Sequence, residues 1–218
     1  MRNYTWKDMA LGAAGGAVGV LAMTLYWKTA TAIRGEDPRS LSREEPDDAL
    51  DDIAVAGQQH EEGEPSTAAA SRLVHEAVTG EEPDEERKRK LSNAVHWGYG
   101  VAMGTAYALL RRRSGTPDAE GGLALGALLW ALGDELAVPL LGLSRGPTAY
   151  PAAQHAHRLG AHLAYGLAVS TATQALYSLT GPRPSKRDVV MKAAKTYLQW
   201  RAIKGIGEAV AGAVRKAA

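Results

Sequence analysis

The 218-residue chain contains no cysteine and no phenylalanine, and it has few acidic residues outside one stretch. The absence of cysteine excludes a disulfide framework, a thiolate metal site and a cysteine nucleophile. Of the 24 acidic residues, 17 lie between residues 36 and 86. The rest of the chain therefore has room for long uncharged windows, although hydrophobic residues make up an ordinary 45% of the sequence.

Four windows of the sequence are long and uncharged enough to cross a membrane as helices. They cover residues 9–27, 92–110, 121–143 and 159–179, and a hydrocarbon core of about 30 Å needs about 20 helical residues. The second and fourth windows contain one histidine each, and the third contains Asp134 and Glu135. We therefore predict an all-α fold: a four-helix transmembrane bundle with a helical acidic loop and an amphipathic C-terminal helix.

The windows divide the chain into four parts. These are the N-terminus with the first span (1–30), an acidic, partly helical loop outside the membrane (31–90), spans two to four (91–180) and a basic tail (181–218). Start and stop signals predict loop helices at 49–59 and 67–79, and a third helix that begins after Pro83 and continues into the second span. In the second loop helix, Leu73, Val74, Ala77 and Val78 form one apolar face.

Two other interpretations of the windows stay open. A soluble protein with core helices rich in alanine and glycine would show similar windows, because the lack of phenylalanine leaves each one only modestly hydrophobic. The first window could also be a cleaved signal peptide, since Lys7 precedes it and residues 30–32 (Ala-Thr-Ala) form a small-residue cleavage pattern. Its apolar stretch is longer than the about 7 to 15 residues of a signal core, and we therefore prefer a span.

Glycines repeat at intervals of four in three of the windows, which favours the membrane interpretation. Glycine inside a helix in water costs about 1 kcal/mol, whereas in lipid the same spacing lets two helix backbones approach closely. The predicted helix-packing positions are Gly12, Gly16, Gly100, Gly104, Gly122 and Gly126.

Ionisable residues lie inside or beside these apolar windows, where an unpaired charge is costly. With four spans, the two acids of the third span lie toward the same membrane surface as the starts of the second and fourth. The predicted polar cluster consists of His96, Asp134, Glu135, His155, Arg158 and His162. We expect Arg158 to pair with one acid. The second acid, beside two or three histidines, suits a proton-responsive site.

Three uses of this cluster remain open: structural charge pairing, proton-linked function and metal binding. For a metal, His96, His162 and Glu135 would supply two imidazoles and a carboxylate to a divalent ion, the cofactor of a membrane enzyme. No phosphate loop, dinucleotide fingerprint or nucleophile elbow is present in the sequence. We expect no cofactor and favour a protein that is not an enzyme. For the protein as a whole, a structural subunit of a membrane assembly is the other alternative, beside the proton-responsive protein and the metal-dependent enzyme.

The tail after residue 182 carries nine basic residues against two acids, a net charge of +7. Apolar residues recur there at helical spacing while basic residues occupy other faces, the pattern of a helix on an anionic membrane surface. The expected contacts with that surface are Lys192, Lys195, Trp200, Arg201 and Lys204. A tail tethered beside a span meets lipid headgroups first, so we do not expect nucleic acid as a partner.

An even number of spans places both termini on one side of the membrane. Basic residues near the spans are almost equally numerous on the two sides, and the further basic residues of the tail favour the cytoplasm for both termini. The predicted partners are a bilayer with anionic headgroups and either a second copy of the chain or another membrane protein.

Three segments resemble the YagU-like family of bacterial inner-membrane proteins. They are HWGYGVAMGTAY (96–107), GALLWALGDELAVPLLGL (126–143) and HRLGAHLAYG (157–166), and the middle segment is the most specific. The resemblance covers roughly residues 9 to 180. It implies a multi-pass inner-membrane protein with a link to acid tolerance and no assigned catalytic activity. The acidic loop and the basic tail depart from the compact pattern of that family.

Overall fold

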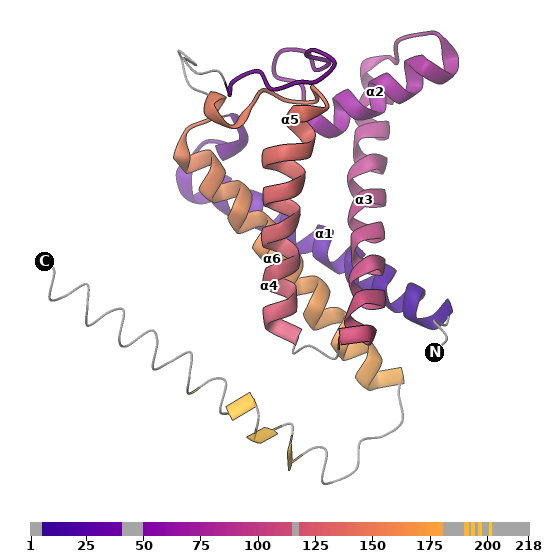
Figure 1. Ribbon diagram of the computed structural model, residues 1–218, viewed down its shortest axis with the longest axis vertical. Coiled ribbons are helices and arrows are strands. Elements are labelled where there is room, and N and C mark those ends of the chain that lie inside the picture. The colour runs from indigo at the N-terminus through magenta and orange to yellow at the C-terminus, as the bar shows by residue number, and fades with distance from the viewer. Residues whose placement is uncertain are drawn as a thin grey trace, which may run out of the picture. The chain divides into compact units, whose positions relative to one another are not determined.

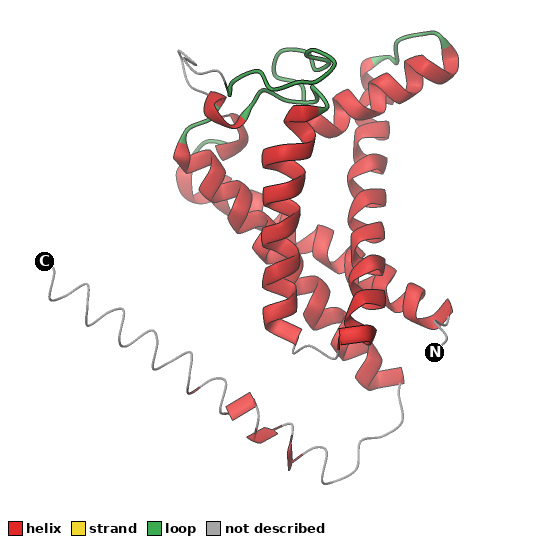
Figure 2. Ribbon diagram, viewed as in Figure 1, coloured by secondary structure: helices red, strands yellow, loops and turns green. Residues whose placement is uncertain are grey.

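The computed structural model describes residues 6–40, 50–114, 118–180, 190–191, 193–194, 196–197 and 201. Across these residues the regular secondary structure is helical, and no strand is present (Figure 2). The predicted all-α class is therefore confirmed. The chain divides into two compact units, Met1–Tyr177 and Ser178–Ala218. The first unit contains all of the candidate site, and the tail is described by itself below.

Three helices of about 30 residues and one composite helix build the first unit. The long helices are α1 (Trp6–Arg34), α3 (Glu85–Ser114) and α6 (Ala152–Thr180). The composite helix consists of α4 (Asp118–Leu128), the π-helix η2 (Leu129–Ala137) and α5 (Val138–Leu140). Figure 1 shows α3 and this composite helix standing side by side, with α1 and α6 crossing them obliquely.

Glycines occupy the helix crossings. On α1 and α3, a Cβ on Gly12 would lie 2.7 Å from the Cβ of Ala108, and a Cβ on Gly16 would lie 2.5 Å from the carbonyl oxygen of Gly100. A Cβ on Gly104 would lie 2.4 Å from the Cα of Gly16. These distances are shorter than any real carbon contact, so the two backbones meet only where both helices lack side chains.

The composite helix meets α6 in the same way. A Cβ on Gly122 would lie 2.6 Å from the carbonyl oxygen of Gly166, and one on Gly126 would lie 2.3 Å from that of His162. The second contact has a consequence for the site, because it brings the helix that carries the two acids directly against the α6 turn that carries His162.

Two helices are long and apolar enough to cross a membrane: α1 and the stretch Ala119–Leu140. Among the described residues, α3 and α6 have comparable length but do not reach the same apolarity. Their windows contain histidines, hydroxyl side chains and several glycines, which lower hydropathy without adding charge. Length and composition therefore support two of the four predicted spans directly.

The region between α1 and α3 lies at one end of the first unit. The 3-10 turn η1 (Pro38–Ser40) follows α1, and α2 (Ser66–Thr79) ends at Gly80, which has a left-handed φ of 76°. The predicted helix at 67–79 is confirmed, and so is the continuous helix through the second window, which is α3. We call residues 50–84 together with residues 141–151 the cap. The second of these segments contains the 3-10 turn η3 (Pro147–Ala149).

The predicted helix at 49–59 is wrong for residues 50–59, which form turns and loop; residue 49 lies outside the described residues. Their backbone donors bond to a distant segment instead of to their own turn. The N–H of Val55 donates to Leu140 O (3.0 Å), and the N–H of Gln59 donates to Gly142 O (2.8 Å). Periodicity alone does not reveal this competing partner, because it lies more than 80 residues away along the chain.

An ion-pair network holds α2 to the rest of the cap and to α3. Arg72 on α2 lies 3.0 Å from Glu64 and 3.3 Å from Glu76, and Lys88 on α3 lies 2.6 Å from Glu61 and 3.0 Å from Glu64. Burial alone would raise the pKa of Glu64. Hydrogen bonds from Arg72, from the N–H of Glu61 and from Lys88 instead lower this pKa to about 2. The ionised form of Glu64 therefore stabilises the cap.

Acid is expected to loosen α2 in a defined pH range. The folded pKa of Glu64 is about 2 and its ordinary value is 4.5, so its contribution is complete above about pH 4.5 and declines as the pH falls toward 2. Amide hydrogen exchange of α2, measured stepwise from pH 6 to pH 3 and corrected for intrinsic rates, should show this loss. Glu64→Gln should weaken α2 and flatten the dependence, whereas Glu62→Gln, at an exposed position, should keep it.

Candidate functional site

The acids Asp134 and Glu135 lie on an unusual element, the nine-residue π-helix η2. A π-helix closes its bonds between residues five apart and usually extends over a single turn, often at a functional site. The N–H of Val138 still donates to the carbonyl of Gly133, five residues earlier. Pro139 follows and has no N–H to give. In this wider helix, consecutive side chains are separated by a smaller angle about the helix axis than in an α-helix. Both acids therefore turn toward α6.

Glu135 and His155 form the tightest contact of the site. His155 Nδ1 lies 2.8 Å from Glu135 Oε1, and His155 Nε2 lies 2.9 Å from the carbonyl oxygen of Pro147. A carbonyl only accepts, so Nε2 carries a hydrogen and donates it. The contact between Nδ1 and the carboxyl group then requires one further proton, located on either partner. The pair thus holds one shared proton, and loss of that proton would place two acceptors face to face.

Asp134 and His162 form a looser second pair. Asp134 Oδ2 lies 3.8 Å from His162 Nδ1, too far for a hydrogen bond but within the range of an ion pair when the imidazole is protonated. His162 Nδ1 donates to Arg158 O one turn earlier (2.9 Å). His96 on α3 is half-buried and interacts electrostatically with both members of the pair. The structure therefore brings α3, η2 and α6 together at this pair.

Arg158 does not make the expected ion pair. Among the described residues it has no carboxylate within 4.0 Å, and its guanidinium lies over the ring of Tyr150 at 4.2 Å from the centroid. A planar cation stacks well on an aromatic face. Tyr150 lies in the loop just before α6. Its contact with Arg158 therefore depends on the conformation of that loop and not on helical spacing. Among the described residues, the ion-pair contacts of the two acids are therefore with histidines, and Arg158 acts on Asp134 only over a longer distance.

The alternative metal ligands are not assembled. The described residues contain no group of three or more histidine or carboxylate side chains arranged to hold a metal ion. Glu135 is engaged by His155, whereas His162 faces Asp134. The two histidines are seven positions apart in the sequence, which places them about 10 Å apart along α6. The set His96, His162 and Glu135 therefore does not form one site in this structure.

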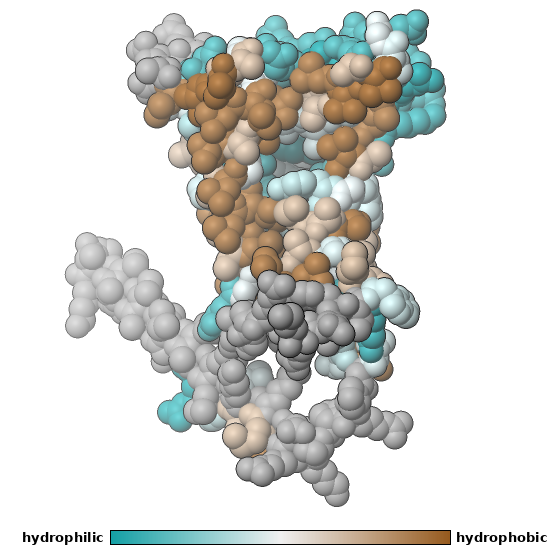
Figure 3. Space-filling view, turned by 45° about the vertical axis from the view of Figure 1, so that its right-hand side comes forward, coloured by the Kyte–Doolittle hydropathy of each residue, from teal (hydrophilic) through white to brown (hydrophobic). Residues whose placement is uncertain are grey.

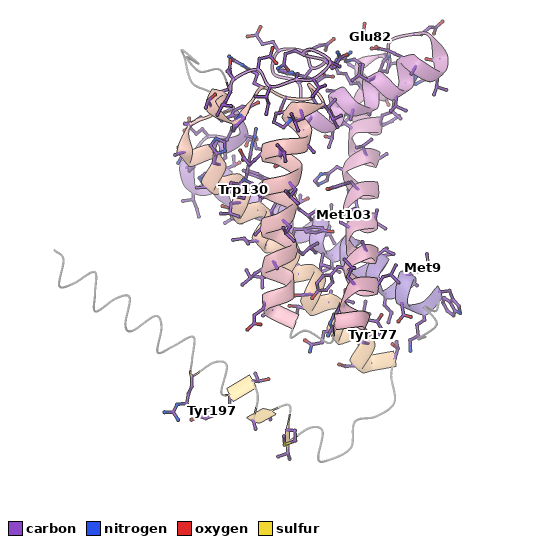
Figure 4. The ribbon with its side chains drawn as sticks, in the orientation of Figure 1. Met9, Glu82, Met103, Trp130, Tyr177 and Tyr197 are labelled. Atoms are coloured by element: carbon purple, nitrogen blue, oxygen red, sulfur yellow. The ribbon has the colours of Figure 1, made fainter. Side chains whose placement is uncertain are left out.

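Asp8 and Gln154 are among the buried polar residues that the sequence did not predict. Asp8, in the first turn of α1, is 2% exposed and accepts a hydrogen bond from the hydroxyl of Tyr177 at 2.7 Å. Figure 4 shows Tyr177 at the end of the unit away from Glu82 and the cap. An acid one residue before an uncharged window was the available signal. Gln154 is fully buried and donates to Arg39 O (2.9 Å), for which the sequence offers no signal.

The predicted membrane-surface contacts of the tail fall mostly outside the described residues. This applies to Lys192, Lys195, Trp200 and Lys204. Arg201 is described as helical and exposed.

Comparisons with family models, with curated proteins and with solved structures give no match to this chain.

Proposed function

We propose that this chain is a small multi-pass protein of the bacterial inner membrane, a four-helix transmembrane bundle whose histidine and carboxylate cluster responds to protons. It serves envelope or acid-stress homeostasis, the role that the resemblance to the YagU-like family suggests. The bilayer is its main partner, and both termini lie in the cytoplasm. The cap then faces the other side of the membrane.

One observation carries the membrane placement: the composite helix exposes its leucines and half-buries its acids, the reverse of a helix on the surface of a soluble protein. Leu128, Leu132 and Leu136 are 56%, 56% and 46% exposed, while Asp134 and Glu135 on the same turns face α6 and are half-buried. In water the leucines would face the core and the acids the solvent. In hydrocarbon the observed arrangement is the stable one.

The first helix supports the same placement. Only 28% of the apolar window of α1 and 11% of that of Ala119–Leu140 is buried, whereas a core helix of a soluble protein buries most of its apolar side chains. On α1, Val18, Leu21 and Leu25 are exposed. The face of the molecule drawn in Figure 3 has a broad hydrophobic band below its hydrophilic upper end. Such a band supports a lipid environment around the first unit.

The less apolar helices α3 and α6 fit the bundle as its site-forming members. Helix α3 contributes His96 and helix α6 contributes His155 and His162, and each of these histidines interacts with one of the acids. Ionisable residues within spans face the interior of a bundle or a water-filled path because the hydrocarbon cannot solvate them. Lower apolarity is therefore the expected property of these two spans.

The paired histidines support a proton-responsive role. Each carboxyl group is matched to one imidazole, the side chain whose charge changes near neutral pH. The contact between Glu135 and His155 is satisfied by one shared proton, so loss of that proton would leave two acceptors facing each other and rearrange it. In the second pair, the distance between Asp134 and His162 can shorten or lengthen when the charge of either side chain changes.

A flux measurement tests this function. Protein reconstituted into liposomes that contain a pH-sensitive dye is expected to show proton movement that depends on external pH. Asp134→Asn should lower the rate at least tenfold, because an amide neither binds nor releases a proton in this pH range. Glu120→Gln, at an exposed position near the start of α4, is the matched control and should retain the wild-type rate.

Equal rates in the wild type and Asp134→Asn would contradict proton movement through the cluster. If the variant instead loses only thermal stability, the acids serve structural pairing. Extraction of the wild-type chain from cell membranes by alkaline carbonate would contradict the membrane placement itself.

A further inference from the structure

The amphipathic helix α2 exposes its larger apolar side chains and buries alanines together with an ion-paired arginine. Val74 and Val78 are 65% and 80% exposed, and Ala77 between them is exposed as well. The buried side of the helix carries Ala68, Ala69, Ser71 and Arg72 instead. An amphipathic helix on a protein normally presents its apolar stripe to the core. Among the described residues, none covers the stripe of α2.

The ion-pair network prevents α2 from rotating this stripe inward. The guanidinium of Arg72 donates to Glu64 at 3.0 and 3.1 Å, to Glu76 at 3.3 Å and to the carbonyl of Gln59 at 2.6 Å. These bonds fix one side of the helix against the cap and α3. A half turn of α2 would bury the valines but would leave this charge cluster unpaired, which costs more than the valines gain.

The height of α2 along α3 is set by two contacts. Thr67 Oγ1 lies 2.9 Å from Ser92 Oγ, and His75 Nε2 lies 3.4 Å from Arg87 Nη1. Ser92 is the first residue of the uncharged window of α3, and the run of four basic residues 87–90 ends just before it. Figure 1 shows α2 lying across this end of α3. Within about 8 Å of helix rise, α2 thus spans the change from charged to apolar sequence.

We propose that α2 is an interfacial helix, with Val74 and Val78 seated at the boundary between the headgroups and acyl chains of the same bilayer. This inference rests on the proposed membrane placement. The exposed side chains of Val95 and Tyr99 continue the apolar surface along α3, and the exposed Arg87, Arg89 and Lys90 lie at the level where phosphate headgroups would be. An interfacial helix buries its apolar face about 5 to 10 Å into that boundary.

The absence of cysteine allows a direct test with single labelled positions. Val78→Cys is labelled with an environment-sensitive fluorophore in full-length protein in liposomes that contain nitroxide-labelled lipids. Leu132→Cys is the control inside the proposed membrane, and Glu82→Cys, at the outer edge of the cap in Figure 4, is the control in water. We expect the label at position 78 to be quenched at least twofold more than the label at position 82.

The outcomes separate the two proposals. Quenching at position 132 without quenching at position 78 would overturn the interfacial helix and leave the membrane placement intact. Absence of quenching at both positions would overturn the membrane placement. If the label at position 78 is protected from lipid but transfers energy between differently labelled copies, the stripe is a contact between two chains, which also overturns the proposal.

Discussion

Gly104→Ala is expected to destabilise the protein by about 3 kcal/mol, the upper part of the range for overpacking a close contact. The added methyl group would lie 2.4 Å from the Cα and 2.5 Å from the backbone nitrogen of Gly16. Both are backbone atoms, so no rotamer change relieves the clash, and α1 and α3 must separate. Unfolding in mixed micelles with increasing denaturing detergent, followed by circular dichroism, measures the loss.

A matched control lies less than two turns away on the same helix. A Cβ on Gly98 meets no heavy atom within 4 Å, so Gly98→Ala adds a methyl group in open space. We expect a change within about 0.5 kcal/mol, or a small gain from helix propensity. Equal stability of the two variants would contradict the close approach of α1 and α3 at Gly104.

Arg72→Met is expected to release the cap with a loss of about 3 kcal/mol, the lower end of the range for removing one partner of a buried ion pair. The substitution keeps an apolar stem but leaves Glu64, whose side chain is 3% exposed, with one cation fewer. Glu61 and Glu76 are more accessible to water, which limits the penalty. Amide hydrogen exchange of α2 should accelerate by about two orders of magnitude, while the amides of α1 and α6 keep their protection.

Lys90→Met provides the comparison for this variant. Lys90 pairs with Glu86 four residues earlier on α3, with both side chains about two-thirds exposed. Exposed pairs of this kind contribute about 0.5 kcal/mol or less. If both variants accelerate exchange in α2 equally, the effect reflects general loss of positive charge and not the buried network.

The site and the cap are joined through His155. One imidazole nitrogen contacts Glu135 on η2, and the other donates to Pro147 O in the cap. The next part of the cap, around Gly142 and Gly146, is bonded to residues 51–60. Movement or loss of the proton shared by Glu135 and His155 therefore affects His155, which is bonded to both η2 and the cap.

Much of the helical architecture was predictable from local pattern. The four windows coincide with the long helices, and α2 ends at Gly80 because glycine adopts the left-handed conformation there. The segment 50–59 was predicted incorrectly, since its donors are taken by residues 140 and 142. The histidines and acids were recognisable as one group because charges inside apolar windows are costly wherever they lie.

By itself the sequence determined where the long helices and α2 run, which glycines recur at packing intervals and which ionisable residues lie inside or beside the apolar windows. These properties depend on periodicity and hydropathy, which are local. The tertiary structure decided the pairing: Glu135 with His155, Asp134 with His162, and Arg158 on Tyr150 instead of on an acid. It also decided that the apolar stripe of α2 faces outward. Such choices depend on the winding of η2 and on loops that connect distant segments, and helical spacing carries no information about either.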